Sequence, residues 1–320
     1  MHVLLLGTAA GGGFPQWNCL CPVCRAARDD PAAAHPRTQS SIALSADGTR
    51  WFLCNASPDV REQLARLPLP LPLPLSDPRL PPGPEGTRER SPVRRVPIEG
   101  IVLTDAELDH SLGLALLREA RDLRLWATEA VIRTLERDSR LLPVTRAFAS
   151  VRVTELRVDS ALELRDASDA PTGLEVEPFL VAGDPPRFAT ADEPGHSVGL
   201  LVRDRATGGR CAYVPACGAL DPPLLARLAD ADLVLFDGTC WTDDELQALG
   251  IGTRGATEMG HLPISGPNGS LEPLSRLSAA RVVYTHINNT NPILLEHSEA
   301  RRAVERAGLT VGMDGMRFRL

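Results

Sequence analysis

The sequence of 320 residues lacks long hydrophobic runs and an excess of basic charge. No stretch approaches the roughly 18 apolar residues of a transmembrane helix, so we expect no membrane partner. The 34 basic residues are outnumbered by 41 acidic ones, and the net charge of −7 argues against a nucleic-acid partner, because phosphate binding requires a basic face. The apolar start, residues 1–6, lacks the basic region and cleavage site of a signal peptide, so we expect a cytoplasmic protein.

A second feature is a proline-rich stretch at residues 67–97. Recurrent proline excludes a helix and a central strand there, so we predict an extended surface insertion. The rest has the apolar and charged content of a globular protein, 43% and 23%. No other linker and no fixed-period repeat is visible, and the sequence therefore predicts one domain over residues 1–320.

Short apolar runs alternate with helical patterns along the rest of the chain. The predicted strands are residues 3–6, 41–44, 51–55, 100–103, 123–127, 151–158, 162–164, 174–181, 198–204, 210–214, 233–236, 281–285 and the C-terminal end. The predicted helices are residues 25–28, 59–67, 112–121, 128–140, 222–228, 271–277 and 298–308. Strands at both ends with interleaved helices predict a layered α/β architecture.

Four ionisable side chains follow the apolar strand 101–103 directly: Asp105, Glu107, Asp109 and His110. A turn at the carboxyl end of a strand is where open α/β folds bind their ligands. The alternative is the acidic start of a helix, where carboxylates favour the positive end of the dipole. That alternative explains Asp105 and Glu107 well, and the Asp109–His110 pair less well.

Three cysteines lie within six residues, at Cys19, Cys21 and Cys24. Thiolates at this spacing suit zinc, and a site without an open position would be structural. The alternative is three unligated thiols in a loop. The apolar surroundings of Cys54 and Cys211, and likewise of Cys240, indicate buried core thiols.

Three histidines have contexts that allow a function. His286 ends an apolar strand, His196 precedes one, and His261 lies in a long loop. For His196 and His261 an ordinary hydrogen-bonded loop histidine is an equal alternative. His2 and His35 have no supporting context.

The frame Thr104-x-x-x-x-Asp109-His110 resembles the metallo-β-lactamase signature Thr-His-x-His-x-Asp-His, with Asp105 and Glu107 in place of the two upstream histidines. In this altered form, residues 104–114 resemble the PqqB family of pyrroloquinoline quinone (PQQ) biosynthesis. Collinear segments with the same resemblance are residues 7–19, 195–200, 236–239, 241–245, 259–266 and 286–294. The proline-rich insertion falls outside it.

The resemblance implies an αββα sandwich in which the bridging aspartate of two-zinc hydrolases is missing near residues 213–217. It leaves two histidines and one carboxylate, the set that non-haem Fe(II) oxygenases use. The implied activity is iron-dependent hydroxylation, by dioxygen, of the tyrosine ring of a Glu–Tyr cross-linked precursor. The implied Fe(II) ligands are Asp109, His110 and His286, and the implied substrate-orienting or proton-transfer residues are His196 and His261, with Asp105 and Glu107 nearby.

For the structural zinc, a related phosphodiesterase branch places a histidine ligand where this chain has Asn289. Its side-chain oxygen, a backbone group or water would complete the site, and His297 is a further alternative. Two rival functions remain: a two-metal hydrolase that uses Asp105 and Glu107 as ligands, and a carrier that holds PQQ or its precursor for transport to the periplasm. We also expect a homodimer.

Overall fold

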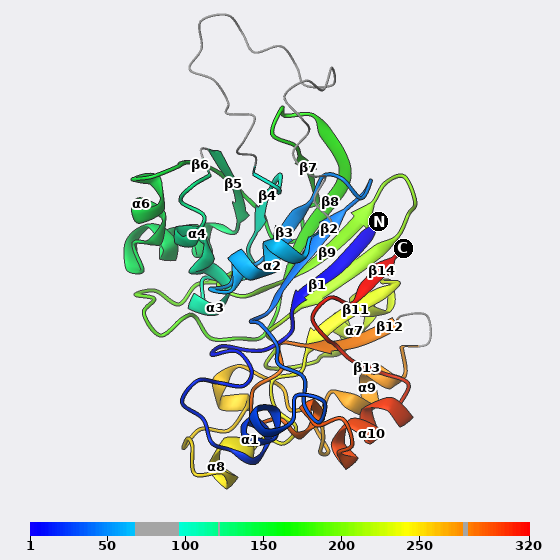
Figure 1. Ribbon diagram of the computed structural model, residues 1–320. Coiled ribbons are helices and arrows are strands. Elements are labelled where there is room, and N and C mark those ends of the chain that lie inside the picture. Colours follow the sequence, from blue (N-terminus) through cyan, green and yellow to red (C-terminus); the bar gives the residue numbers. More distant parts are fainter. Residues whose placement is uncertain (68–95, 121, 278–280) are drawn as a thin grey trace, which may run out of the picture.

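The computed structural model describes residues 1–67, 96–120, 122–277 and 281–320, and its strands form two seven-stranded sheets (Figure 1). The first sheet has the order β14 (Arg317–Arg319), β1 (His2–Gly7), β2 (Ser41–Ser45), β3 (Phe52–Cys54), β4 (Gly100–Val102), β5 (Asp122–Ala127) and β6 (Ser150–Glu155). The second has the order β13 (Thr310–Val311), β12 (Arg281–Thr285), β11 (Leu233–Asp237), β10 (Arg210–Val214), β9 (Val198–Asp204), β8 (Pro171–Leu180) and β7 (Leu162–Arg165). The predicted insertion at 67–97 lies almost wholly outside the described residues.

Alternating side chains of the strands build two different cores. On β1, Val3 and Leu5 point into the core between the sheets, whereas Leu4 and Leu6 belong to the core under the helices of the first sheet. The strand is apolar throughout because both of its faces are covered. Full burial of each such side chain contributes about 1.5–3 kcal/mol, so these cores hold the layers together.

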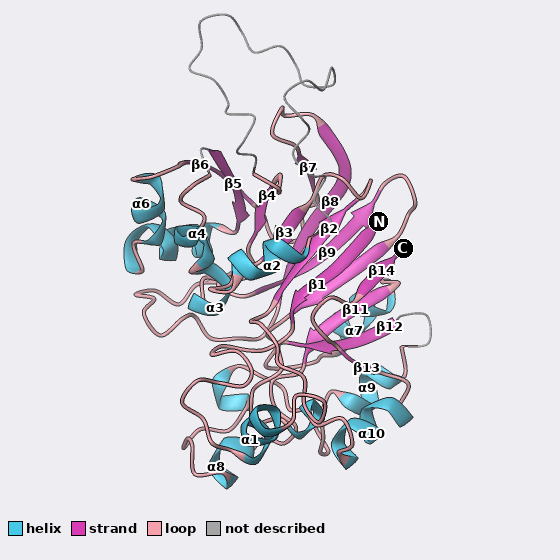
Figure 2. Cartoon of the chain, in the orientation of Figure 1, coloured by secondary structure: helices cyan, strands magenta, loops and turns pink. Residues whose placement is uncertain are grey.

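Helices cover the outer face of each sheet (Figure 2). Those packed on the first sheet are α2 (Val60–Arg66), α4 (Gly113–Leu116), α5 (Glu129–Arg133), the π-helix η1 (Thr134–Asp138) and α6 (Leu141–Arg146), and the short helix α3 (Leu108–Ser111) contacts α4. On the second sheet lie α1 (Pro22–Asp29), α7 (Pro222–Ala229), α9 (Leu271–Ser275) and α10 (Glu299–Arg306). The remaining helices are α8 (Glu245–Ala248) and the 3₁₀ turns η2 (Thr257–Met259) and η3 (Pro292–Leu294). The layers therefore follow the predicted αββα order. In the part of the chain that the structure describes, no helix has the length and apolarity needed to cross a bilayer.

The predicted helix at 112–121 is wrong in its bounds. The structure has two short helices, α3 and α4, which begin four residues earlier and meet at Gly113. The Gly113 N–H donates to Ala56 O at 2.9 Å, and a Cβ on Gly113 would lie 2.4 Å from Ser57 O. This close approach fixes the start of α4, and it places Asp109 and His110 inside the short helix α3. The predicted helix at 128–140 likewise divides into α5 and the π-helix η1.

The parallel strands of both sheets end on one side of the molecule. In the first sheet β3, β4, β5 and β6 run parallel, and in the second β10, β11, β12 and β13 do. The ionisable residues that follow β4, β11 and β12 are contributed by these carboxyl ends. This is the location at which α/β sheets bind ligands.

Candidate metal centre

The turn after β4 is organised by Asp105, which is almost fully buried. One oxygen, Oδ2, lies 2.7 Å from His110 Nδ1 and accepts a hydrogen bond from Thr104 Oγ1 at 2.7 Å. The other, Oδ1, accepts from the Glu107 N–H at 2.9 Å. A carboxylate on Nδ1 fixes the imidazole and leaves Nε2 as the ligand atom. Asp105 is therefore placed to orient His110.

Ligand atoms of Asp109, His110 and His286 converge within 4.8 Å of one another. His286 Nε2 lies 3.2 Å from Asp109 Oδ2, and His110 Nε2 lies 3.9 Å from that oxygen. His110 Nε2 is buried and has no hydrogen-bond partner among the described residues. Burial by itself lowers the pKa of His110. The negative charges of Asp105 and Asp109 outweigh this effect, and the pKa of His110 is raised. The cluster thus favours a positive charge at its centre.

His286 is held by Thr239 in a conformation that few side chains adopt. Its φ is 53°, in the left-handed region, just beyond the end of β12. The Thr239 hydroxyl lies 2.9 Å from His286 Nδ1 and 3.0 Å from its backbone oxygen. Such backbone strain costs on the order of 1–3 kcal/mol and persists where surrounding contacts impose it. Here those contacts direct Nε2 toward Asp109.

A second group, Asp237, His261 and His286, adjoins the first. Asp237 Oδ2 lies 2.8 Å from His261 Nδ1, and Asp237 Oδ1 accepts from Thr239 Oγ1 at 2.6 Å. The Cys217 N–H donates to Asp237 at 3.0 Å, so the segment 213–217 does reach the site, although it supplies no carboxylate. These atoms satisfy one another, and the group is a hydrogen-bonded Asp–His pair. Despite the opposing effect of burial, the Asp237 carboxylate raises the pKa of His261, whose ring stacks on His286 at 5.3 Å.

Glu107 lies beside this centre, and His196 lies in the loop that precedes β9. His196 is buried, and neither of its ring nitrogens has a hydrogen-bond partner in the described part of the chain. It follows Gly195 in the loop before β9, whose Val198 N–H donates to Thr104 O at 2.9 Å. Glu107 lines a cavity of about 320 Å³ that also touches Asp109. Partial enclosure of its carboxyl, together with repulsion by neighbouring carboxylates, raises the pKa of Glu107 to about 7.

The donor set fits a divalent metal. Two imidazoles each have Nδ1 occupied by a hydrogen-bond partner and Nε2 directed at one shared carboxylate oxygen. This pattern is the usual arrangement of histidine ligands, in which the partner on the far nitrogen sets the tautomer. Two nitrogens and one carboxylate oxygen leave further coordination positions for exogenous ligands.

The three cysteines form a second candidate metal site, of Cys19, Cys21 and Cys24. Asn289 Nδ2 lies 3.3 Å from Cys24 Sγ, and Asn289 O lies 3.6 Å from Cys21 Sγ. Rotation of the Asn289 side-chain amide by a half-turn would direct its oxygen, instead of its nitrogen, at Cys24 Sγ. The N-terminal loop reaches this segment because Ala9 bridges Ile287. Asn289 is thus adjacent to the thiols through both its side chain and its backbone, and its role as a zinc ligand stays a prediction.

Several residues of the site were not identified from the sequence. The sequence alone predicts Asp237 only as a substrate or supporting contact, although its position at the end of the apolar strand β11 is a usable signal for a site residue. Nothing in the sequence distinguished Thr239 or Arg187 from other loop residues. Asn55, which bonds Thr104 N at 3.0 Å, was read only as the end of a strand. The other thiols singled out, at 54, 211 and 240, are buried as expected.

The fold and this centre define a member of the metallo-β-lactamase superfamily, a class whose fold and metal ligands point to a metal-dependent enzyme. The model of the beta-lactamase superfamily domain matches residues 50–287. The structure is also similar to a diphosphatase from the PhnP family, with a TM-score of 0.64, 20% identity, and coverage of 100% of this chain and 97% of that one. At that identity the likeness concerns the fold alone.

Closer relatives narrow the assignment. The chain is 41% identical to coenzyme PQQ synthesis protein B of Methylobacterium nodulans, over 100% of both chains. It is 38% identical to PqqB from Methylobacterium extorquens, whose crystal structure is Zn²⁺-bound, with a TM-score of 0.83 and full coverage of both chains. The chain belongs to the PqqB family.

Proposed function

We propose that this chain acts in PQQ biosynthesis as an iron-dependent hydroxylase of the tyrosine ring of a Glu–Tyr cross-linked precursor. The observation that carries the proposal is the convergence of Asp109 Oδ2, His110 Nε2 and His286 Nε2 on one point. The names of the full-length relatives support the pathway.

The residues at this point would hold the metal as two imidazoles and one carboxylate. Fe(II) so held supplies the activation of dioxygen and retains open positions for it. Each hydroxylation inserts one oxygen atom into a ring C–H bond, and the other oxygen atom becomes water. This balance consumes two electrons and two protons, which an external reductant such as ascorbate provides in an assay.

The surrounding side chains have separate tasks. Asp105 keeps the proton of His110 on Nδ1, and Thr239 positions His286. His261, with Nδ1 held by Asp237, presents its other nitrogen as a group that takes up or delivers a proton beside the substrate. His196, buried without a described partner, stays a candidate for orienting the substrate.

The hydrolase alternative is less well supported by these contacts. It requires Asp105 as a metal ligand, whereas both oxygens of Asp105 already bond His110, Thr104 and the Glu107 N–H. A carboxylate engaged in this way orients a ligand more readily than it binds a second metal.

The test is anaerobic reconstitution with Fe(II), then exposure to oxygen with the precursor and ascorbate, followed by mass spectrometry. We expect a gain of one or two oxygen atoms that is lost in His110→Ala and His286→Ala. His35→Ala, which removes a half-exposed histidine outside the centre, is the matched control and should retain the activity. If the wild type binds iron and the precursor gains no oxygen, the proposal is overturned.

For the cysteine cluster we propose a structural zinc ion, as a separate metal from the one at the histidines. Cys21 and Cys24 are buried, and Asn289 lies against both of their thiols, which supports a closed, structural site. Burial raises the pKa of Cys21 to about 12, and the thiol therefore stays protonated until a cation binds.

A further inference from the structure

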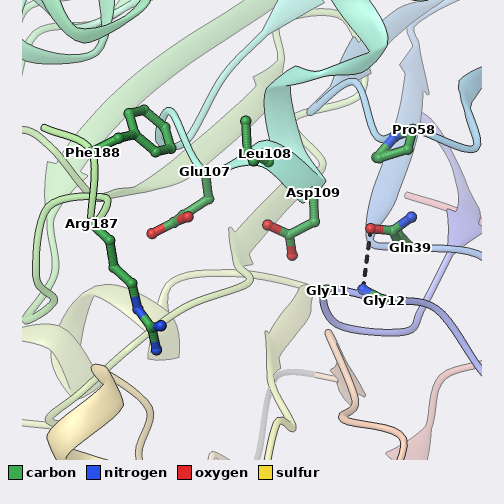
Figure 3. A pocket seen from close by; sticks show the side chains of 9 residues that line it. All are labelled: Gly11, Gly12, Gln39, Pro58, Glu107, Leu108, Asp109, Arg187 and Phe188. Atoms are coloured by element: carbon green, nitrogen blue, oxygen red, sulfur yellow. Dashed lines mark hydrogen bonds between the residues drawn. The ribbon is translucent and has the colours of Figure 1, made fainter. Parts of the chain in front are cut away.

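A cavity of about 320 Å³ opens beside Asp109 and is lined by five separate segments of the chain, which include Gln39 and Pro58 (Figure 3). One wall is the loop at Gly11 and Gly12, the second is the turn from Glu107 to Asp109, and the third is Arg187 with Phe188. Its volume lies at the lower end of the range of about 300–1,000 Å³ for small-molecule sites. A ligand in this cavity would reach the candidate metal ligands directly.

The glycine loop brings backbone close to the metal-binding carboxylate. A Cβ on Gly11 would lie 3.4 Å from Asp109 Oδ2, in van der Waals contact, so the loop backbone passes directly beside that ligand. Gly12 has a φ of +92°, and its N–H donates toward Gln39 Oε1 at 3.4 Å. This wall is therefore uncharged and close, and it leaves the charged groups of the pocket on the other two walls.

The other two walls carry a guanidinium and a carboxyl group. Figure 3 shows the Glu107 carboxylate directed to the side of the pocket where Arg187 and Phe188 lie, with Asp109 on its other side. Among the residues drawn, no hydrogen bond joins Arg187 to Glu107. Both side chains are exposed, so each retains hydrogen-bonding capacity for a ligand. A guanidinium and a carboxyl group that ionises beside a cation line this small pocket, and together they match a zwitterion better than a singly charged group.

The head group of an α-amino acid is such a zwitterion, with an ammonium and a carboxylate on one carbon. A guanidinium binds carboxylates through a planar fork of two N–H donors, and a carboxylate binds an ammonium by charge-assisted hydrogen bonds. Phe188 lines the same cavity and provides an apolar surface for the adjoining carbon chain.

We infer that Arg187 and Glu107 bind one α-amino-acid head group of the substrate, with Arg187 on its carboxylate and Glu107 on its ammonium. The inference rests on the proposed function, since the cross-linked precursor carries two such head groups. Arg187 and Glu107 would then anchor one end of the precursor in the cavity and hold it beside Asp109.

Binding tests this without turnover. Zinc-loaded protein is titrated calorimetrically with the synthetic Glu–Tyr cross-linked amino acid, with its methyl ester blocked at the carboxylates, and with its N-acetylated form. Arg187→Gln should weaken binding of the free acid by roughly 10- to 100-fold and leave the affinity for the ester unchanged. Glu107→Gln should weaken binding of the free amine and leave the affinity for the N-acetylated form unchanged. Arg276→Gln removes an exposed arginine that directly follows α9 and is the matched control.

The outcomes separate this inference from the proposed reaction. If Arg187→Gln binds the free acid as tightly as the wild type, or loses acid and ester equally, the inference is wrong. If Arg187→Gln loses affinity for the free acid alone while iron-loaded wild type inserts no oxygen, that result would support the head-group site and refute the hydroxylase proposal. A wild type that binds none of the three compounds would overturn both.

Discussion

Replacing Glu245 by glutamine should make the protein more stable at alkaline pH and leave it nearly unchanged at acidic pH. Glu245 begins α8 and is 7% exposed. Its Oε2 accepts from the Trp241 N–H at 2.6 Å, and its Oε1 accepts from the Thr290 hydroxyl. Burial outweighs these hydrogen bonds and raises the pKa of Glu245 from 4.5 to about 7. The folded state therefore holds this proton more tightly than the unfolded state.

The sign and size of the stability change follow from the difference between the pKa values of Glu245 in the folded and unfolded states. The folded state binds more protons than the unfolded state between pH 4.5 and about 7, so the stability contributed by the neutral carboxyl is present below pH 4.5 and lost as pH rises to about 7. At about 1.4 kcal/mol for each pH unit between the two pKa values, the full loss is about 3 kcal/mol. About 2 kcal/mol of it falls between about pH 5.5 and about pH 8.

The assay is urea unfolding of zinc-loaded wild type and Glu245→Gln at several pH values. The difference between the two proteins isolates this residue, because other titrating groups act equally in both. We expect the variant to gain about 2 kcal/mol relative to the wild type across that window. Glu272→Gln, at an exposed ion pair with Arg276, is the control for loss of a surface charge. A difference that does not change with pH would refute the assignment of a buried, neutral Glu245.

The remaining predictions concern the two metal sites. Asp105→Asn should weaken metal binding about 10- to 100-fold, because an amide no longer fixes the His110 tautomer; chelator competition measures this, and unchanged affinity would contradict it. Thr239→Val keeps the side-chain shape but removes the hydroxyl at His286 Nδ1, and we expect roughly tenfold weaker metal binding in the same assay, with the wild-type value as the contrary result. Cys24→Ser should lower the zinc content by one ion per chain and the melting temperature by roughly 5 °C or more, as metal analysis and calorimetry can show; full zinc retention would argue against the cysteine site.

Much of the fold could be predicted because its signals are local. The apolar runs that form β1, β11 and β12 predict the strand positions closely, and Asp47–Gly48, a pair that favours a tight turn, lies between the paired strands β2 and β3. The helix after the acidic turn was misplaced because its boundary depends on Gly113 packing against the backbone at 56–57. That contact joins segments more than fifty residues apart, and no local pattern reports it.

The sequence by itself determined which side chains offer metal-binding chemistry: the Asp109–His110 pair, His286 after its strand, and the three closely spaced thiols. Only the tertiary structure decided how these groups combine. It places Asp105 on the far nitrogen of His110, pairs His261 with Asp237, and brings Arg187 to the cavity beside Asp109. The reason is physical: a ligand's tautomer and orientation depend on hydrogen bonds from residues close in space, and the packing of two sheets sets that proximity.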